Sequence, residues 1–143
     1  MKIRFGKKSD WKALYKILNK TPELQSMGDK NNYPDYLVKY FLADMKRNLC
    51  LIVEENRKIV GFILAEMWKG RKSSFLVDLY VNPDFRGRGV AKALFDKYSD
   101  ICKKEGFVSL GAMTFLNNKP ALKFFESRGF SKGNRFFYLE KKI

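Results

Sequence analysis

Histidine is absent from the 143 residues, and only two cysteines occur, Cys50 and Cys102. Without histidine, Ser/His and Cys/His catalytic arrangements and most zinc sites are excluded, so we expect no metal. The two cysteines form no CxxC pair, and we expect free buried thiols in a reducing cytosol. No run approaches 18 apolar residues, and the basic N-terminus has no apolar stretch of the signal-peptide kind. These features predict a cytoplasmic protein with no membrane partner.

Repeats, low-complexity tracts and linkers are also lacking. Hydrophobic residues make up 45% of the chain and aromatic residues 15%, which excludes a disordered tail protein. A chain of this length can bury a core without disulfide bridges. We therefore expect one domain over residues 1–143.

The net charge is +14, from 29 basic and 15 acidic side chains, and the excess gathers in residues 86–104 and 117–143. Such a balance attracts polyanions, which include nucleic acid and phosphorylated ligands. A nucleic-acid- or ribosome-binding module is therefore one hypothesis, although no helix-turn-helix or RNA-binding motif stands out. A lysine-rich surface that only maintains solubility is the other interpretation of the same charge.

Apolar periodicity, capping residues and turn residues predict a mixed α/β fold with antiparallel hairpins first and a crossover unit after them. The expected strands are residues 2–6, Leu49–Glu54, Lys58–Trp68, Ser74–Val81, Phe107–Thr114 and Arg135–Lys141. The expected helices are Asp10–Asn19 with Ser9 as its N-cap, Asp35–Arg47, Gly89–Glu105 and Lys119–Ser127. The segment Thr21–Pro34 is expected to be a loop, and Glu55–Arg57 a hairpin connection.

A turn with two glycines connects a predicted strand to a predicted helix within Val81–Ala91. Gly87 and Gly89 carry no Cβ, so the backbone there can approach a ligand closely. The first N–H groups of the following helix have no intrahelical partners, and its positive dipole end lies at the same place. Arg86 and Arg88 add charge. The turn is thus predicted to bind an anion, although it lacks the sequence of a P-loop or of a dinucleotide fingerprint.

Two motifs in residues 75–130 resemble those of the GNAT acetyltransferase superfamily. Arg86-Gly87-Arg88-Gly89-Val90-Ala91, which follows Val81-Asn82-Pro83, is similar to the signature Gln/Arg-x-x-Gly-x-Gly/Ala. Residues 118–130 resemble the second motif, Asn-x-x-Ala-x-x-Phe-Tyr-x-x-x-Gly-Phe. The resemblance implies an acyl-CoA N-acyltransferase fold with a mixed antiparallel and parallel sheet, flanked by helices and splayed at the third or fourth strand for CoA. It also implies direct transfer of acetyl from acetyl-CoA to a primary amine in a ternary complex.

The resemblance assigns roles to residues of both motifs. The backbone of Leu79, Tyr80 and Val81 would pair with pantetheine, and one N–H would polarise the thioester carbonyl. Asn118 would hydrogen-bond pantetheine, and Phe125 would lie near the sulfur. The main chain expected to hold the pyrophosphate is that of Arg86, Gly87, Arg88, Gly89, Val90 and Ala91. Core packing of Leu79, Val81 and Phe125 is compatible with these roles.

One position departs from the family pattern. Phe125 stands where many members have a tyrosine that protonates the leaving thiolate, and a phenyl ring cannot donate a proton. Water or a neighbouring hydroxyl such as Tyr138 would then serve. The departure leaves open a CoA-binding member with weak catalysis.

The general base is left open between two carboxylates on the central strands. Asp78 comes directly before the pantetheine-pairing stretch, and Glu66 lies near the end of the neighbouring strand. Residues 78–81 resemble Glu-Asp-Leu-Phe-Val of diamine acetyltransferases, with Val77 in place of the first acid. A structural ion pair is the alternative for Asp78. Because Cys102 lies on the helix after the turn, no acetyl-cysteine intermediate is expected.

The acceptor is open among a small amine or polyamine, an aminoglycoside-like compound, and a protein N-terminus or lysine. The segment Lys20–Tyr33 and the helix after it are expected to shape its pocket, as they usually do in this superfamily. The oligomeric state is open as well, with a homodimer among the alternatives.

Overall fold

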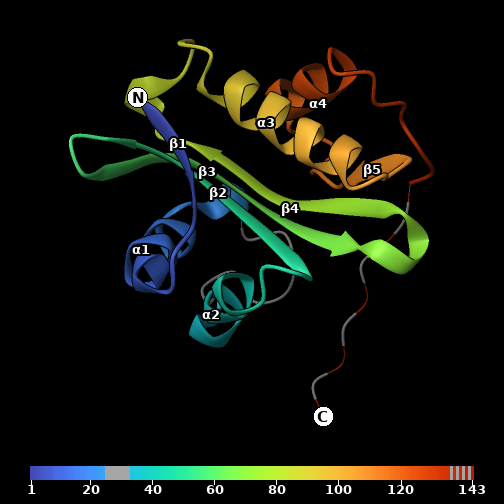
Figure 1. Ribbon diagram of the computed structural model, residues 1–143. Coiled ribbons are helices and arrows are strands. Elements are labelled where there is room, and N and C mark those ends of the chain that lie inside the picture. Colours follow the sequence, from blue (N-terminus) through green and yellow to red (C-terminus); the bar gives the residue numbers. More distant parts are fainter. Residues whose placement is uncertain (25–32, 136, 138, 140, 142) are drawn as a thin grey trace.

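A five-stranded mixed sheet lies between two pairs of helices in the computed structural model, which describes residues 1–24, 33–135, 137, 139, 141 and 143 (Figure 1). The strands are β1 (Lys2–Phe5), β2 (Asn48–Glu55), β3 (Lys58–Trp68), β4 (Ser73–Val81) and β5 (Ser109–Ala112). The helices are α1 (Trp11–Lys20), α2 (Asp35–Ala43), α3 (Val90–Lys104) and α4 (Lys119–Glu126). The predicted mixed α/β fold is confirmed.

The strands lie in the order β1-β2-β3-β4-β5, with β1 to β4 antiparallel to their neighbours and β5 parallel to β4. The β2–β3 hairpin turns through Asn56 and Arg57, which adopt positive φ angles of 50° and 61°. A crossover through α3 joins β4 to β5, because parallel strands cannot be connected by a tight turn. None of the helices in the described residues is long and apolar enough to cross a membrane.

Both faces of the sheet are covered, so β2 and β3 are apolar along most of their length. On one face, Leu14 and Leu18 of α1 and Phe41 of α2 pack against Phe62 and Leu64 of β3. The other face is covered mainly by α3. Its core side chains there are Val90, Leu94, Phe95, Tyr98 and Cys102.

The sheet opens between β4 and β5. The two strands pair only where Ser73–Leu76 meets Ser109–Ala112, and β4 then continues to Val81 without β5 beside it. The predicted splay is therefore present at the fourth strand. It leaves main-chain N–H and C=O groups on this stretch of β4 available to an added strand-like partner.

A β-bulge on β4 directs Asp78 to the face that α1 and α2 cover. Leu64 lies opposite Asp78 while its neighbour Ala65 lies opposite Leu76, so Val77 is the extra residue. Directly opposed residues of two strands point to the same face, and Leu64 is in the core under α1 and α2. The bulge therefore sets the direction of the Asp78 carboxylate.

Several predicted boundaries are wrong. Ser9 does not cap α1 but lies in a 3₁₀ turn over Lys8–Asp10, where the Asp10 carboxylate accepts the N–H of Lys7 at 2.7 Å. The second helix ends at Ala43, because Asp44 leaves helical geometry (φ −127°, ψ 86°) and its side chain accepts the N–H of Lys46 at 3.0 Å, which begins the turn into β2.

The predicted loop Thr21–Pro34 contains a 3₁₀ turn over Pro22–Leu24, and its residues 25–32 lie outside the described residues. Of the predicted strand Phe107–Thr114, only Ser109–Ala112 pairs with β4. In the predicted strand Arg135–Lys141, the described residues 135, 137, 139 and 141 are not in a strand, and its residues 136, 138 and 140 lie outside the described part.

Candidate active site

The glycine-containing turn connects β4 to α3 through a 3₁₀ turn over Pro83–Phe85. The Asn82 side chain begins this turn by accepting the N–H of Asp84 at 3.0 Å. Gly87 and Gly89 then adopt φ angles of 73° and 77°, which residues with a Cβ rarely adopt. The two glycines are therefore needed for the backbone path that brings the chain into α3.

The N-terminus of α3 faces open space. A Cβ placed on Gly87 or Gly89 would meet no atom within 4 Å. Gly89 occupies the N-cap position and has no side chain to accept the free N–H groups of the first turn. These groups and the positive helix dipole end thus remain available to an anionic ligand.

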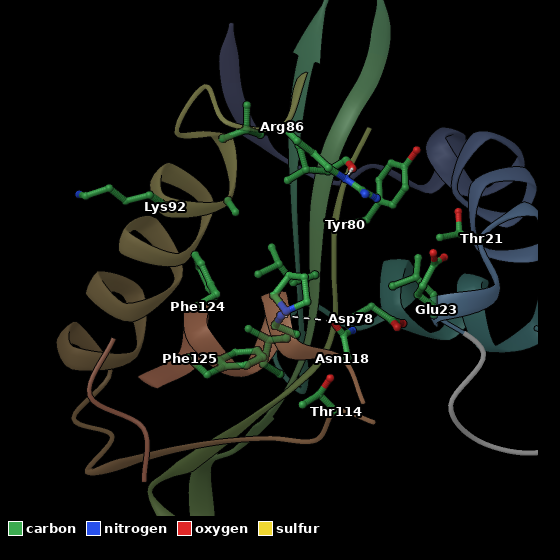
Figure 2. A pocket seen from close by; sticks show the side chains of 18 of the residues that line it. Thr21, Glu23, Asp78, Tyr80, Arg86, Lys92, Thr114, Asn118, Phe124 and Phe125 are labelled. Atoms are coloured by element: carbon green, nitrogen blue, oxygen red, sulfur yellow. Dashed lines mark hydrogen bonds between the residues drawn. The ribbon is translucent and has the colours of Figure 1, made fainter. Parts of the chain in front are cut away.

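One cavity of about 540 Å³ extends from this turn to the opposite face of β4 (Figure 2). Thr21 and Glu23, which follow α1, lie on one side of it, and Phe124 and Phe125 of α4 lie on the other. It follows the opening between β4 and β5. Among the residues that line it are Leu76, Asp78, Leu79, Tyr80, Val81, Phe85, Arg86, Gly87, Gly89, Val90, Ala91, Lys92, Thr114, Asn118, Phe125 and Arg128.

The predicted CoA-contacting residues line this cavity, with the exception of Arg88. The Arg88 guanidinium lies 5.1 Å from the centre of the Phe85 ring instead. Arg86 reaches back along the strand, and its Nε donates to the carbonyl of Val81 at 3.1 Å. A phosphate group at the turn would therefore meet main-chain N–H groups, with Arg86 beside them.

Asn118 caps α4 and lines the cavity at the same time. Its Oδ1 accepts the N–H of Ala121 at 3.2 Å. The side-chain NH₂ group remains as the donor for a ligand in the cavity.

Phe125 lines the cavity and also packs against the core. The centre of its ring lies 5.6 Å from that of Phe124 and 5.1 Å from that of Phe130. Core packing of Phe125 is therefore compatible with its place in the cavity wall, as expected from the sequence.

Asp78 is a buried carboxyl group in the cavity wall, with 4% of its surface exposed. The Tyr33 hydroxyl donates to its Oδ2 at 3.0 Å. Burial raises the pKa of Asp78 to about 7, and the hydrogen bond from Tyr33 opposes that rise. Within the described residues no cation pairs with Asp78, so the ion-pair alternative finds no support there.

Glu66 lies away from the cavity wall. Its Oε2 accepts the indole N–H of Trp68 at 3.0 Å, and it is not among the residues that line the cavity. Its negative charge nevertheless contributes to raising the pKa of Tyr33, so Glu66 faces the same region as Asp78. The structure thus brings Asp78, but not Glu66, to the cavity with the predicted CoA-contacting residues.

Charged side chains of both signs line the cavity. Glu23 and Asp78 are acidic residues in its lining, and Arg86, Lys92 and Arg128 are basic ones. Glu23 lies in the segment Lys20–Tyr33 that was expected to shape the acceptor pocket, whereas sequence reasoning missed Lys92 and Arg128 as cavity residues. Arg128 directly precedes Gly129 of the second motif and Lys92 follows Ala91 of the first, so only closeness to a motif could have indicated them.

Comparison with known proteins assigns the family. The model of the acetyltransferase (GNAT) family matches residues 11–130. The chain is 28% identical over 142 residues to a putative phosphinothricin acetyltransferase, YwnH, of Bacillus subtilis (strain 168), covering 95% of this chain and 87% of that protein. The chain therefore belongs to the GNAT family, and it is an acetyl-CoA-dependent N-acetyltransferase.

Solved structures share the fold at low sequence identity. The aminoglycoside N-acetyltransferase AAC(6′)-Iy in complex with CoA has a TM-score of 0.74 and 22% identity, with 99% of this chain and 100% of that chain covered. The same protein with the bisubstrate analogue CoA-S-monomethyl-acetylneamine has a TM-score of 0.77 and 20% identity, with 99% and 98% covered. These likenesses support the GNAT fold assigned above.

Proposed function

We propose that residues 1–143 form one N-acetyltransferase domain that passes acetyl directly from acetyl-CoA to a primary amine bound in the same cavity. The observation that carries the proposal is the continuity of the cavity from Gly87 and Gly89 to the buried carboxyl of Asp78. Both substrates can be present at once in such a space. A bisubstrate analogue, which joins CoA to the acceptor, occupies one structural neighbour and is consistent with this arrangement.

Acetyl-CoA would be held mainly by main-chain groups. The N–H groups at Gly87, Gly89 and the first turn of α3 would bind the pyrophosphate. The stretch Leu79–Val81, which β5 does not cover, would pair with pantetheine like an added strand. An N–H on the same stretch would stabilise the oxyanion that forms when the amine attacks the thioester.

Asp78 would attract the ammonium form of the acceptor and accept its proton, directly or through one water. Its pKa of about 7 lies close to neutral pH, where a general base works best. Glu66, which is outside the cavity wall, is the alternative if Asp78 is only structural.

The leaving thiolate would be protonated without a side-chain acid at position 125. Coenzyme A thiol has a pKa near that of cysteine, about 8.5, so the thiolate is a tolerable leaving group near neutral pH. A solvent proton delivered through water would neutralise it, and the hydroxyl of Thr114, which lines the cavity, would hydrogen-bond that water. Tyr138, the donor predicted from the sequence, lies outside the described residues.

A covalent acetyl-cysteine route is disfavoured. Cys50 and Cys102 are buried, and neither lines the cavity. Burial raises the pKa of Cys50 to about 12 and raises that of Cys102 as well. Both thiols therefore stay protonated and poorly nucleophilic near neutral pH.

The acceptor is expected to be cationic, because Glu23 and Asp78 are carboxyl groups in the lining of the cavity. Small amines, polyamines, aminoglycoside-like compounds and protein amines all meet this condition. A homodimer and a cytoplasmic location stay predictions from the sequence. Nucleic-acid binding is the competing class, and the charge of +14 is the observation that favours it.

A panel of amines with acetyl-CoA tests the proposal, with release of CoA thiol and mass spectrometry of each amine as readouts. Intersecting initial-rate lines for the two substrates would indicate a ternary complex, whereas parallel lines would indicate an acetyl-enzyme. The double variant Cys50→Ser/Cys102→Ser should keep its activity. Binding of CoA without acetylation of any amine would contradict the proposal and favour a CoA-binding module with weak catalysis.

A further inference from the structure

Tyr33 reaches Asp78 from a part of the chain that carries no motif. It lies two residues before α2, and its hydroxyl donates to Asp78 Oδ2 across 45 residues of sequence. Burial, and next the Asp78 carboxylate, raise the pKa of Tyr33 far above its ordinary value. The hydroxyl therefore keeps its proton, and it can serve Asp78 only as a donor.

The backbone of Tyr33 is fixed by one side chain of α1. Asn19 accepts the N–H of Tyr33 at 2.9 Å and donates to its carbonyl at 3.1 Å. The same NH₂ group also donates to the carbonyl of Tyr15 inside α1 at 3.0 Å. Two hydrogen bonds to the main chain of one residue leave it little freedom, so the end of α1 sets where the Tyr33 ring enters the protein.

The end of α1 also supports the acceptor side of the cavity. Thr21 and Glu23 follow the helix directly and line the cavity, and the Thr21 hydroxyl donates to the carbonyl of Ile17 at 2.8 Å. Asn19 and Thr21 thus belong to one short stretch that places both Tyr33 and the acceptor wall. Asp78 itself comes from β4, on the other side of the opening.

The hydrogen bond divides the roles of the two Asp78 oxygens. Oδ2 is occupied by Tyr33, while Oδ1 has no hydrogen-bond donor among the side chains that the structure describes. Because the Asp78 side chain lines the cavity, Oδ1 is the oxygen left to take a proton from an amine there. A carboxylate with one oxygen fixed can turn less freely, so its second oxygen keeps one direction.

We propose that Tyr33, held by Asn19, is a positioning residue that orients the Asp78 carboxylate toward the acceptor amine. This inference rests on the proposed function, in which Asp78 accepts the proton. It makes the α1 end and the residue before α2 part of the catalytic machinery, although neither carries a family motif. The competing explanation is that a buried hydroxyl and a buried carboxyl only satisfy each other's hydrogen-bonding needs.

The variant Tyr33→Phe separates these explanations, because it keeps the ring and removes the hydroxyl. A hydrogen bond to a charged group favours the charged form, so its loss should raise the pKa of Asp78 by about one to two pH units. The acid limb of the kcat/KM profile should move upward by the same amount. Activity at pH 6.5 should fall about tenfold to a hundredfold and should recover only in part at high pH, because the ionised carboxylate would still turn more freely, while the KM for acetyl-CoA stays unchanged.

Other titratable groups around the site are left in place. These groups are Glu23 after α1, Glu66 on β3, Tyr80 on β4 and Arg86 in the turn after β4. Tyr36→Phe is the matched control, since this α2 side chain is 71% exposed and does not line the cavity. Its pH profile should match that of the wild type. The double variant Tyr33→Phe/Asp78→Asn should be no slower than Asp78→Asn, because the hydroxyl would act only through Asp78.

A folded Tyr33→Phe protein with an unshifted profile would overturn the proposal, even if its rate or melting temperature fell. Absence of any acetyl transfer by the wild type would instead contradict the proposed function. The proposal would still be tested in that case by carbon-13 NMR of the Asp78 carboxyl, assigned with Asp78→Asn. An unchanged pKa in Tyr33→Phe overturns the proposal, because the hydroxyl would then not act on the carboxylate.

Discussion

At the scale of single residues, Asp78 combines burial with a place in the cavity wall. Its exposed surface is 4%, and its hydrogen bond comes from a tyrosine rather than from a cation. Desolvation disfavours a carboxylate when no positive charge compensates it. Burial therefore destabilises the folded protein at high pH, where Asp78 is ionised. It also raises the pKa of Asp78 toward neutral pH, which suits a group that accepts a proton from an amine.

Asp78→Asn should therefore lower kcat/KM by about 10²–10⁴-fold if Asp78 is the base. Asparagine keeps the shape of the side chain and an oxygen for the Tyr33 hydroxyl, while charge and basicity are lost. The loss should shrink as pH rises, because more of the acceptor amine is then already neutral. Initial rates from pH 6 to 9 check this, and CoA affinity by calorimetry should stay within a few-fold.

The stability of the same variant provides an independent control. Since the folded protein holds the Asp78 proton up to a pKa of about 7 and the unfolded chain releases it near pH 4, the folded state loses stability as pH rises between these values. Asp78→Asn removes that loss, so its melting temperature relative to wild type should improve from pH 5 to pH 8. A stable variant with near-normal turnover would shift the base role to Glu66.

Phe125→Tyr tests whether a side-chain acid near the sulfur limits the reaction. The ring packs against Phe124 and Phe130, and one added hydroxyl next to the cavity should leave folding intact. That hydroxyl could raise turnover by up to about 10²-fold, the low end of general-acid effects. Measurements of kcat across pH 6–9 decide the matter, and an unchanged or lower rate would mean that another donor already operates.

At the scale of elements, the start of α3 is the feature that we propose to bind the phosphates of CoA. Its free N–H groups lie beside Gly89, whose φ angle is 77° and whose Cβ direction faces open space. Gly89→Glu should abolish CoA binding, because a carboxylate would enter the space where the phosphates would lie. Isothermal titration calorimetry measures the loss.

Gly106→Glu is the matched control at the other end of the same helix. Gly106 also has a φ angle of 77°, and a Cβ placed on it would meet no atom within 4 Å, but it does not line the cavity. The two variants therefore share backbone strain and added charge. If folded Gly89→Glu binds CoA as tightly as Gly106→Glu does, the phosphate site has been placed at the wrong turn.

Sequence patterns predicted most helices and strands, because the turn residues and the apolar periodicity that define such an element lie within the element itself. The predicted strand Lys58–Trp68 has the same bounds as β3, because turn residues lie at both of its ends. Pro83 and the two glycines also predicted the turn between β4 and α3. Family motifs likewise indicated the cavity residues on β4, α3 and α4. By contrast, the Asp44 side chain ends α2 by accepting the N–H of Lys46, a turn signal that apolar periodicity alone does not show.

The acceptor side could not be predicted in the same way. The contact of Tyr33 with Asp78 depends on how α1 and α2 pack on the sheet and on the bulge at Val77. These are consequences of tertiary structure, which neither periodicity nor a short motif encodes. The sequence could place Asp78 on a strand next to the CoA-pairing stretch, but it could not provide its hydrogen-bond partner.

At the scale of the whole molecule, the net charge is +14, while Glu23 and Asp78 are carboxyl groups in the lining of the cavity. The general positive field attracts anionic CoA to the protein, while the two carboxyl groups favour a cationic acceptor inside. If main-chain N–H groups hold the phosphates, the affinity for CoA depends on close hydrogen bonds more than on the long-range field. Salt then distinguishes CoA binding from binding of nucleic acid.

Raising the salt concentration from 50 to 200 mM should weaken CoA binding by less than about tenfold, because short hydrogen bonds in a cavity are screened little. Binding of a labelled single-stranded RNA should weaken far more steeply, by about 300-fold or more if six or more phosphates are contacted. Calorimetry with CoA and fluorescence anisotropy with the RNA measure how each affinity depends on the salt concentration.

The variant Lys103→Gln/Lys104→Gln is the control, since both lysines lie at the end of α3 away from the cavity. It should weaken binding of the RNA and leave the affinity for CoA unchanged. An equally steep slope for CoA would show that side-chain charges, rather than the turn at Gly87 and Gly89, hold the phosphates.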